Sequence, residues 1–158
     1  MHEAARAHEE LAGEGLEFLL GYEPGMEWAN FLDRTERLRH GIALSETQVP
    51  ETFLVAEIGG QLVGRVSIRH HLNPALRLVG GHIGYSVRPG FRRNGFAGQI
   101  LDLALIEARN LGICEALLTC DADNLASRRL IESHDGVPEV LNSQETVTKP
   151  KLRYWITT

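Results

Sequence analysis

The sequence of 158 residues predicts one domain with a mixed α/β fold. Apolar residues recur at helical spacing before residue 52, whereas residues 52–70 alternate like two strands around a Gly-Gly turn. An amphipathic stripe over residues 97–111 then separates a third strand from a fourth, as a crossover helix does between parallel strands. The order is helices, antiparallel strands, a crossover helix, a parallel strand, a short helix and two final strands, which indicates a mixed sheet covered by helices.

The first 51 residues predict two helices separated by a turn. Apolar residues between positions 11 and 20 are interleaved with glutamates, and the glycines at 13, 15 and 21 interrupt this segment. After the turn at Tyr22–Gly25, apolar residues at 28, 31, 32 and 38 recur near helical spacing, and Gly41 marks an end. The chain therefore begins with helical rather than strand sequence.

Three strands are predicted next. Residues 53–58 and 62–70 form a hairpin around a two-glycine turn, where positive φ costs nothing. Residues 79–87 form the third strand, which ends before Pro89. These strands would make the antiparallel part of the sheet.

The remaining elements alternate between helix and strand. The helix over 97–111 is followed by a buried strand over 115–120, which we expect to run parallel to the third strand because a crossover helix precedes it. A short helix covers 124–133. Residues 139–147 and 151–157 alternate like a closing antiparallel pair.

Composition and charge exclude several classes of function. Hydrophobic residues make up 43% and charged residues 23%, which is an ordinary globular balance. The net charge of −5 argues against non-specific binding to nucleic acid or to anionic membranes. Two cysteines cannot build a disulfide framework or a zinc site alone. With no signal peptide and no apolar run of membrane length, we expect a cytoplasmic protein with no nucleic-acid, membrane or metal partner.

The most informative segment is the junction over residues 87–98, between the third strand and the long helix. A helix start points several unpaired backbone N–H groups at one spot, and the helix dipole adds positive charge there. This arrangement suits a phosphate or pyrophosphate. Small residues at 95, 97 and 98 let phosphate oxygens approach the backbone, and Arg92 and Arg93 can add charge-assisted hydrogen bonds.

Two familiar phosphate-binding loops are absent from the sequence. It contains no Gly-x-x-x-x-Gly-Lys-Ser/Thr, and no Gly-x-Gly-x-x-Gly follows the first strand. The alternative interpretation is that these glycines only make a tight turn before a helix. Arg92-x-x-Gly95-x-Ala97 is a weak pattern alone, but its place between a strand and a long apolar stripe favours the phosphate site.

This segment resembles the acyl-CoA-binding signature of the GNAT superfamily, an Arg/Gln-x-x-Gly-x-Gly/Ala loop between a strand and a long helix. Asp121–Ile131 resembles the later motif of the family, and Gly81–Tyr85 with Arg153–Ile156 is similar to a bacterial, largely uncharacterised GNAT subgroup. The resemblance implies the GNAT-like acyl-CoA N-acyltransferase fold. Residues 1–51 would form a helical acceptor-side region, and residues 52–158 would form the sheet with the acyl-CoA loop.

The resemblance implies acetyl-CoA as acyl donor, with no metal and no covalent acyl-enzyme. Pantetheine would lie as a pseudo-strand along Tyr85–Val87, where the sheet splays apart at a bulge, and the N–H of Val87 would hold the oxyanion. Asn124 would hydrogen-bond the pantetheine arm, with Ser127 near the pyrophosphate or the thiol. The implied cofactor-binding residues are Tyr85, Ser86, Val87, Arg92, Arg93, Asn94, Gly95, Phe96, Ala97, Gly98, Asn124 and Ser127.

Proton transfer has several candidates. His82 stands where many family members place a Glu, and its ordinary pKa of about 6.5 suits a base. The alternative is a sheet histidine that a neighbour satisfies, and both interpretations stay open. Tyr85 and Tyr154 could protonate the departing thiolate. Two departures from the family are Ile131, where several subfamilies place an acidic Tyr, and the helical start where the family usually has a strand.

We therefore expect an N-acetyltransferase that acts on a primary amine of a small molecule or a peptide. Tyr22, Trp28 and Phe31, with nearby acidic residues, suit a cationic acceptor, or they pack two helices on the sheet. The alternative function is a catalytically silent acyl-CoA-binding sensor or partner domain, and a structural domain without a CoA site is a third. Residues 154–156 would pair two copies in a homodimer or belong to the core.

Overall fold

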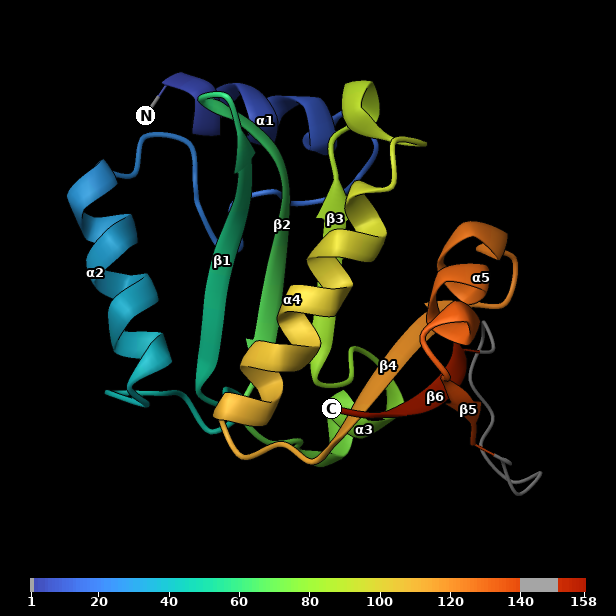
Figure 1. Cartoon of the computed structure of the whole chain (residues 1–158). Helices are drawn as coiled ribbons and strands as arrows, with labels where there is room; N and C mark the ends of the chain where they lie inside the picture. The colour runs from blue at the N-terminus through green and yellow to red at the C-terminus, as the bar shows by residue number, and fades with distance from the viewer. Residues whose placement is uncertain (1, 140–150) are drawn as a thin grey trace.

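The computed structural model describes residues 2–139 and 151–158 of the chain (Figure 1). Helices surround two small sheets, and the N-terminal helices lie beside the first of them. The elements in chain order are α1 (His2–Ala12), α2 (Trp28–Arg39), β1 (Glu51–Ile58), β2 (Gln61–Arg69), α3 (Pro74–Leu78), β3 (Ile83–Val87), the 3-10 helix η1 (Pro89–Phe91), α4 (Phe96–Asn110), β4 (Glu115–Asp121), α5 (Leu125–Ser133), β5 (Val137–Pro138) and β6 (Lys151–Thr157).

The first sheet is antiparallel, in the order β1-β2-β3. The predicted hairpin is confirmed, with Glu51 opposite Arg69 and a two-glycine turn. The predicted third strand was too long at its start, because it begins at Ile83 rather than residue 79. Gly80 and Gly81 have φ values of +111° and +64°, which no strand adopts. The backbone therefore turns sharply before it enters β3.

Helix α3 is an element that the sequence prediction missed. The Asn73 side chain accepts the Leu76 N–H at 2.9 Å, and Pro74 occupies the first helical position. An Asn-Pro pair after a strand is compatible with a simple strand end as well as with a helix start. Five residues are too few for a clear helical period, so the capping residues were the signal to use.

The second sheet is also antiparallel, in the order β4-β6-β5. β4 and β6 pair over their whole lengths, and β5 contributes Val137 and Pro138 to the other edge of β6. The Glu139 N–H extends this edge by donating to the Arg153 carbonyl at 2.8 Å. The predicted final strand over 151–157 is confirmed as β6, whereas most of its predicted partner over 139–147 lies outside the described residues.

The two sheets meet at one end only. β4 rises in the same direction as β3 but leans away from it (Figure 1). The expected parallel pairing is not formed among the described residues, which show no ladder between these strands and only an isolated bridge of antiparallel type between Gly81 and Leu118. A Cβ on Gly81 would lie 2.3 Å from the Leu117 carbonyl oxygen, so only glycine fits this close approach. The strands are thus fastened at the base and open beyond it.

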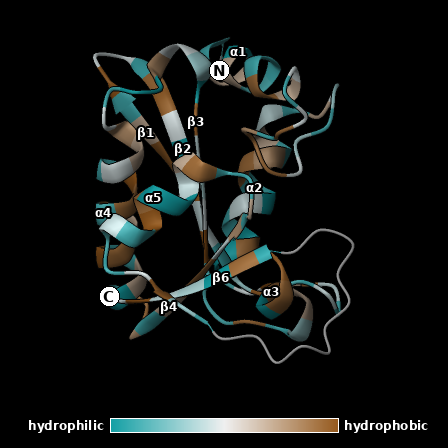
Figure 2. Ribbon diagram, turned by 90° about the vertical axis from the view of Figure 1, so that its right-hand side faces the viewer, coloured by the Kyte–Doolittle hydropathy of each residue, from teal (hydrophilic) through white to brown (hydrophobic). Residues whose placement is uncertain are grey.

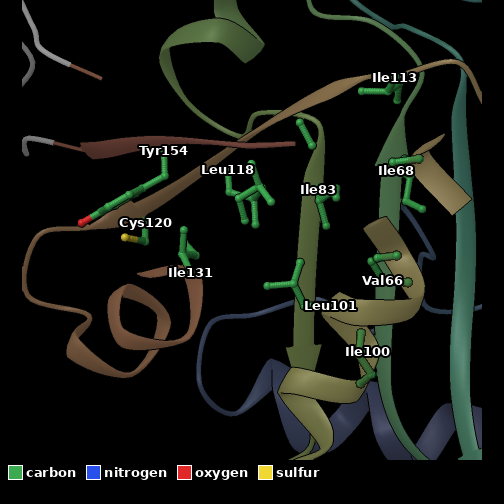
Figure 3. Packing of buried hydrophobic residues seen from close by; sticks show 14 of the residues in the cluster. Val66, Ile68, Ile83, Ile100, Leu101, Ile113, Leu118, Cys120, Ile131 and Tyr154 are labelled. Carbon is green, nitrogen blue, oxygen red and sulfur yellow. The ribbon is translucent and has the colours of Figure 1, made fainter. Parts of the chain in front are cut away.

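One hydrophobic core joins both sheets through α4, which confirms the predicted crossover helix. Ile100, Leu101 and Ala104 are buried on its inner face. Figure 3 shows this cluster between α4, β3 and β4. Tyr154 and Ile156 are also buried, so these two residues of β6 belong to the core of the chain. Labelled members from the sheets and α5 are Val66, Ile68, Ile83, Leu118, Cys120 and Ile131.

A second core packs α1 and α2 against the other face of the first sheet. Phe18, Leu19 and Phe31 are buried there. Figure 2 shows hydrophilic and hydrophobic residues alternating along α1 and α4, as amphipathic helices require. Arg88, only 2% exposed, pairs with Glu3 and Glu10 of α1 and fixes this helix on the sheet. No helix in residues 2–139 and 151–158 is both long and apolar enough to cross a membrane.

Candidate functional site

A cleft of about 730 Å³ opens where β3 and β4 have diverged. The exposed edge of β3 forms its floor, the start of α4 forms one side, and α5 forms the opposite side. The connector between α1 and α2 completes one wall. The lining residues are Glu14, Leu16, Tyr85, Ser86, Val87, Phe91, Arg92, Arg93, Gly95, Phe96, Ala97, Gly98, Asn124, Ala126, Ser127 and Leu130.

The floor of the cleft offers backbone hydrogen-bonding groups at alternate residues. The Arg88 N–H donates to the Val63 carbonyl at 3.0 Å, and the His82 carbonyl accepts a β2 N–H at 2.8 Å. The even-numbered residues of β3 therefore pair with β2, and the register shows no shift between these strands. The backbone groups of Tyr85 and Val87 consequently point away from β2. No described strand pairs with this edge along the cleft.

The side of the cleft at α4 is a helix start without a side-chain cap. Gly95 is the N-cap residue with φ of +80°, and a Cβ added there would meet nothing within 4 Å. The N–H groups of Gly98 and Gln99 both donate to the Gly95 carbonyl. Those of Phe96 and Ala97 precede the first intrahelical bond and have no partner among residues 2–139 and 151–158, so they can bind an anion in the cleft.

The two arginines of the loop both line the cleft. Arg92 donates from Nε to the Val87 carbonyl at 3.0 Å and pairs with Glu14 through its two terminal nitrogens. Arg93 has φ of +64°, a conformation that costs a non-glycine residue energy and that clusters at functional sites. Asn94 does not line the cleft. Its amide donates to two loop carbonyls, at 3.2 and 3.1 Å, and so shapes the turn.

The side of the cleft at α5 carries the two predicted residues of the later motif. The Asn124 Oδ1 accepts the Ser127 N–H at 3.1 Å and caps α5, which leaves the amide Nδ2 directed to other acceptors. The Ser127 hydroxyl lies 2.8 Å from the Tyr85 hydroxyl, so the pair spans the cleft from α5 to β3. Burial raises the pKa of Tyr85, which therefore keeps its proton at neutral pH.

The other predicted acid, Tyr154, lies outside the cleft lining. Its hydroxyl donates to Glu132 at 3.1 Å, and burial, followed by the hydrogen bond with this carboxylate, raises the pKa of Tyr154. Glu132 is also held by Arg128 at 2.8 Å. This tyrosine thus fastens β6 to α5, and of the two tyrosines only Tyr85 faces the cleft.

His82 lies at the base, where the two sheets join. Its Nδ1 accepts the Leu117 N–H at 2.9 Å, and its own backbone N–H donates to the Leu117 carbonyl at 2.7 Å. The ring contacts Trp155 edge-on. Burial, then the positive charge of Arg69 and the proximity of His71, lower the pKa of His82 and favour its neutral form. The ring lone pair that a base needs is already accepting a hydrogen bond.

Five further residues line the cleft, and the sequence did not single them out for it: Glu14, Leu16, Phe91, Ala126 and Leu130. Phe91, Ala126 and Leu130 lie beside predicted site residues in the loop and in α5, whereas Glu14 and Leu16 come from the distant α1–α2 connector. Arg65 holds the α1–α2 connector in place, donating from Nε and the terminal NH2 nitrogen to the Glu17 carbonyl at 3.2 and 3.0 Å. No local pattern reveals such contacts, because partners 48 residues apart meet only in the folded chain.

The cleft can hold an elongated ligand with an anionic part. Free N–H groups and two guanidinium groups lie at the α4 end, and the edge of β3 offers pairing groups to an extended chain. Leu16, Phe91 and Leu130 supply apolar lining. Across residues 2–139 and 151–158, no group of three or more His, Cys, Asp or Glu side chains could hold a metal ion.

Comparisons with known proteins give one family and one fold. The acetyltransferase (GNAT) family matches residues 17–136 of the chain. The putative acetyltransferase yncA from Salmonella typhimurium, solved with acetyl-CoA, is similar at a TM-score of 0.63 and 18% identity, over 98% of this chain and 87% of that one. A ribosomal-protein-alanine N-acetyltransferase from Brucella melitensis is similar at 0.64 and 22%, over 98% and 93%.

A spermidine N-acetyltransferase SpeG chimera from Vibrio cholerae and hSSAT is similar at a TM-score of 0.62 and 20% identity, over 99% of this chain and 92% of that one. A search of curated proteins found no matching sequence. The solved structures support the fold, and the family match covers most of the chain, including the loop and both sides of the cleft.

Proposed function

Because this chain belongs to the acetyltransferase (GNAT) family, we propose that it transfers the acetyl group of acetyl-CoA to a primary amine by direct attack on the thioester. One observation carries this proposal. Every residue expected to bind the cofactor lines one cleft, with the exception of Asn94, which shapes the loop from behind. These residues come from β3, α4 and α5, so their convergence is a property of the fold rather than of one local motif.

The residues present fit an acyl-CoA. The N–H groups of Phe96 and Ala97 and the guanidinium groups of Arg92 and Arg93 would hold the pyrophosphate. Gly95 leaves open space beside them. The N–H groups of Tyr85 and Val87 point away from β2 and suit the pairing that an extended pantetheine requires, whereas the Val87 carbonyl already accepts from Arg92. The amide Nδ2 of Asn124 can donate to the pantetheine from the opposite side.

Two groups of the chain would carry the chemistry. The Val87 N–H would stabilise the negative charge that develops on the thioester oxygen during amine attack. The Tyr85 hydroxyl, in contact with Ser127, would donate a proton to the departing thiolate. The role of His82 as base remains a prediction, and its hydrogen bond with Leu117 supports instead a structural role.

The acceptor is proposed to be an amine of a small molecule or a peptide. Two structural neighbours are named for spermidine and for a ribosomal-protein alanine, which are both amines. We propose that residues 1–51 form the acceptor side of the single domain, since their connector supplies Glu14 and Leu16 to the cleft. A cytoplasmic location and pairing of two copies belong to the same proposal.

A catalytically silent acyl-CoA-binding domain is the second candidate. Ile131 is buried at 1% exposure, so no proton donor stands where several subfamilies have a tyrosine. Tyr85 and Ser127 supply a hydroxyl pair in the cleft, which favours the active enzyme. Turnover on a panel of amines separates these candidates, because only the enzyme releases CoA.

Calorimetric titration with acetyl-CoA tests the proposal. We expect the wild type to bind in roughly the micromolar range, and Gly95→Glu to lose binding, since its carboxylate would occupy the pyrophosphate position. Gly60→Glu is the matched control, because Gly60 shares the φ of +80° and the open surroundings of Gly95 but lies in the β1–β2 turn.

The outcomes are distinct. If folded wild type does not bind acetyl-CoA, the proposed function fails. If Gly60→Glu loses binding as fully as Gly95→Glu, the loss comes from charge or strain, and the assignment of the loop fails.

A further inference from the structure

The α1–α2 connector places a carboxylate at the arginine of the phosphate loop. Glu14 pairs with Arg92 through both oxygens, at 3.0 and 2.5 Å, although the two residues are 78 positions apart in the chain. Both side chains are about two-fifths exposed, at 39% and 41%, and both residues line the cleft. This paired, fork-to-fork geometry is the one by which arginine also recognises a phosphate.

The other side of Arg92 is already occupied. Its Nε donates to the Val87 carbonyl at 3.0 Å, which fixes the plane of the guanidinium against the end of β3. The edge that faces the cleft therefore carries the two terminal nitrogens, and Glu14 engages both of them. The carboxylate therefore takes one N–H from each terminal nitrogen, the same pair of donors that a phosphate would use in this fork geometry.

We propose that Glu14 is an internal anion that competes with the cofactor pyrophosphate for Arg92 and thereby weakens acyl-CoA binding. This inference rests on the proposed function, since it assigns a further residue to the same cofactor site. A pyrophosphate that reaches Arg92 must displace Glu14 or lie beside its negative charge, and either event costs binding free energy. The hydrogen bonds from Arg92 lower the pKa of Glu14, so this carboxylate stays charged at neutral pH.

Displacement of Glu14 leaves the connector anchored. The Glu17 carbonyl still accepts two hydrogen bonds from Arg65, and the Glu17 side chain accepts the Gly21 N–H at 3.2 Å. Phe18 and Leu19 stay buried in the second core. The exchange therefore requires movement of one partly exposed side chain, and the connector can keep its fold when the cofactor binds.

A double-mutant cycle tests this competition. The dissociation constant for acetyl-CoA is measured by calorimetry for wild type, Glu14→Gln, Arg92→Gln and the double variant. We expect Glu14→Gln alone to bind about threefold to fivefold more tightly, the upper part of the range for a partly exposed ion pair. In the Arg92→Gln background, the same substitution should change the constant less than twofold, because the contested donor is absent, so the two substitutions should be non-additive.

The control is Glu9→Gln, which removes the same charge from an exposed residue of α1 for which no pairing is found among the described residues. It should leave the constant unchanged. Three results would overturn the inference: weaker binding by Glu14→Gln, which makes Glu14 a residue that positions Arg92; equal tightening in the Arg92→Gln background; or equal tightening by Glu9→Gln. Absence of binding by the folded wild type instead removes the proposed function itself, and the inference with it.

Discussion

β3 and β4 contact each other at one end and are separated at the other. At the base, the bridge at Gly81 and Leu118 is reinforced by hydrogen bonds between His82 and Leu117. At the other end, the strands have separated, and between them lies a cleft bordered by free backbone groups and small residues. The same two strands are thus held together by hydrogen bonds at Gly81, His82, Leu117 and Leu118, a contact that we call the joint. They are separated at the other end, where the cleft opens.

This difference teaches where the reactive residue types are used. His82, the predicted candidate base, lies in the joint and accepts the Leu117 N–H there. At the open end, the proposed binding groups are the backbone N–H groups of Phe96, Ala97 and Val87, which the residue types do not reveal. The proposed chemistry therefore depends on which backbone groups are left unpaired.

The strongest way to break the joint is Gly81→Ala. A Cβ would lie 2.3 Å from the Leu117 carbonyl oxygen, at a φ of +64° that disfavours side chains. We expect the free energy of unfolding to fall by about 3 kcal/mol, as measured by urea denaturation. Gly60→Ala, with φ of +80° and no atom near the added Cβ, should cost only about 1 kcal/mol. Equal losses of unfolding free energy in the two variants would mean that backbone strain at positive φ, rather than the close approach of Gly81 to Leu117, explains the effect.

A milder change to the joint is His82→Ala. It leaves the buried Leu117 N–H without an acceptor, so stability should fall by about 2 kcal/mol. Activity of the folded variant should stay within about threefold of wild type, whereas loss of a general base typically costs at least about a hundredfold. His82→Asn should recover part of the stability, because its side-chain oxygen can accept the same N–H.

The pH dependence of stability supplies a second readout for His82. Burial lowers its folded-state pKa below the ordinary 6.5, so the unfolded chain binds more protons as the pH falls through this value. Stability is therefore present above pH 6.5 and declines below it, and His82→Asn should reduce this slope. Burial also lowers the pKa of His70, which would account for the pH dependence that remains in this variant. The hydrogen bond from Arg88 lowers the pKa of Glu10, so carboxylates of this kind reduce stability only when the pH falls below their ordinary pKa of 4.5.

The smallest expected effect concerns the open end. Tyr85→Phe removes the hydroxyl that contacts Ser127, and kcat should fall about threefold to tenfold with little change in KM. The loss is modest because a thiolate leaves readily without a strong acid. Tyr154→Phe is the matched control, since its hydroxyl contacts Glu132 outside the cleft lining. A larger kcat loss in this control would transfer the acid role to Tyr154.

Elements with a clear period could be predicted from the sequence. The stripe of α4 and the alternation of β1 and β2 follow from side chains within one segment, and the structure confirms them. The start of β3 could not be predicted from apolar content, because the chain turns at positive φ through Gly80 and Gly81, where Gly81 lies against Leu117 of β4. The periodicity of a segment predicts that an element exists, but a close contact with a distant segment can set where that element begins.

The candidate site divides in the same way. The loop at Arg92–Gly98 was visible because its spacing is local and its context is a strand followed by a helix. The partner of Arg92 was not visible, since Glu14 has no sequence feature that distinguishes it from the neighbouring glutamates. The structural position of His82 depends on Leu117, 35 residues away, so no reading of its own strand could choose between base and structural residue.

The alternation along β3 gives this short strand two populations of amide hydrogens. Those of Ser86 and Arg88 are held by β2 and should exchange slowly with deuterated solvent, because exchange requires the ladder to open. Those of Tyr85 and Val87 face the cleft and should exchange rapidly until a ligand pairs with them. Occupancy of the cleft is thus recorded residue by residue in the protection of a single strand, independently of turnover or of the identity of the acceptor.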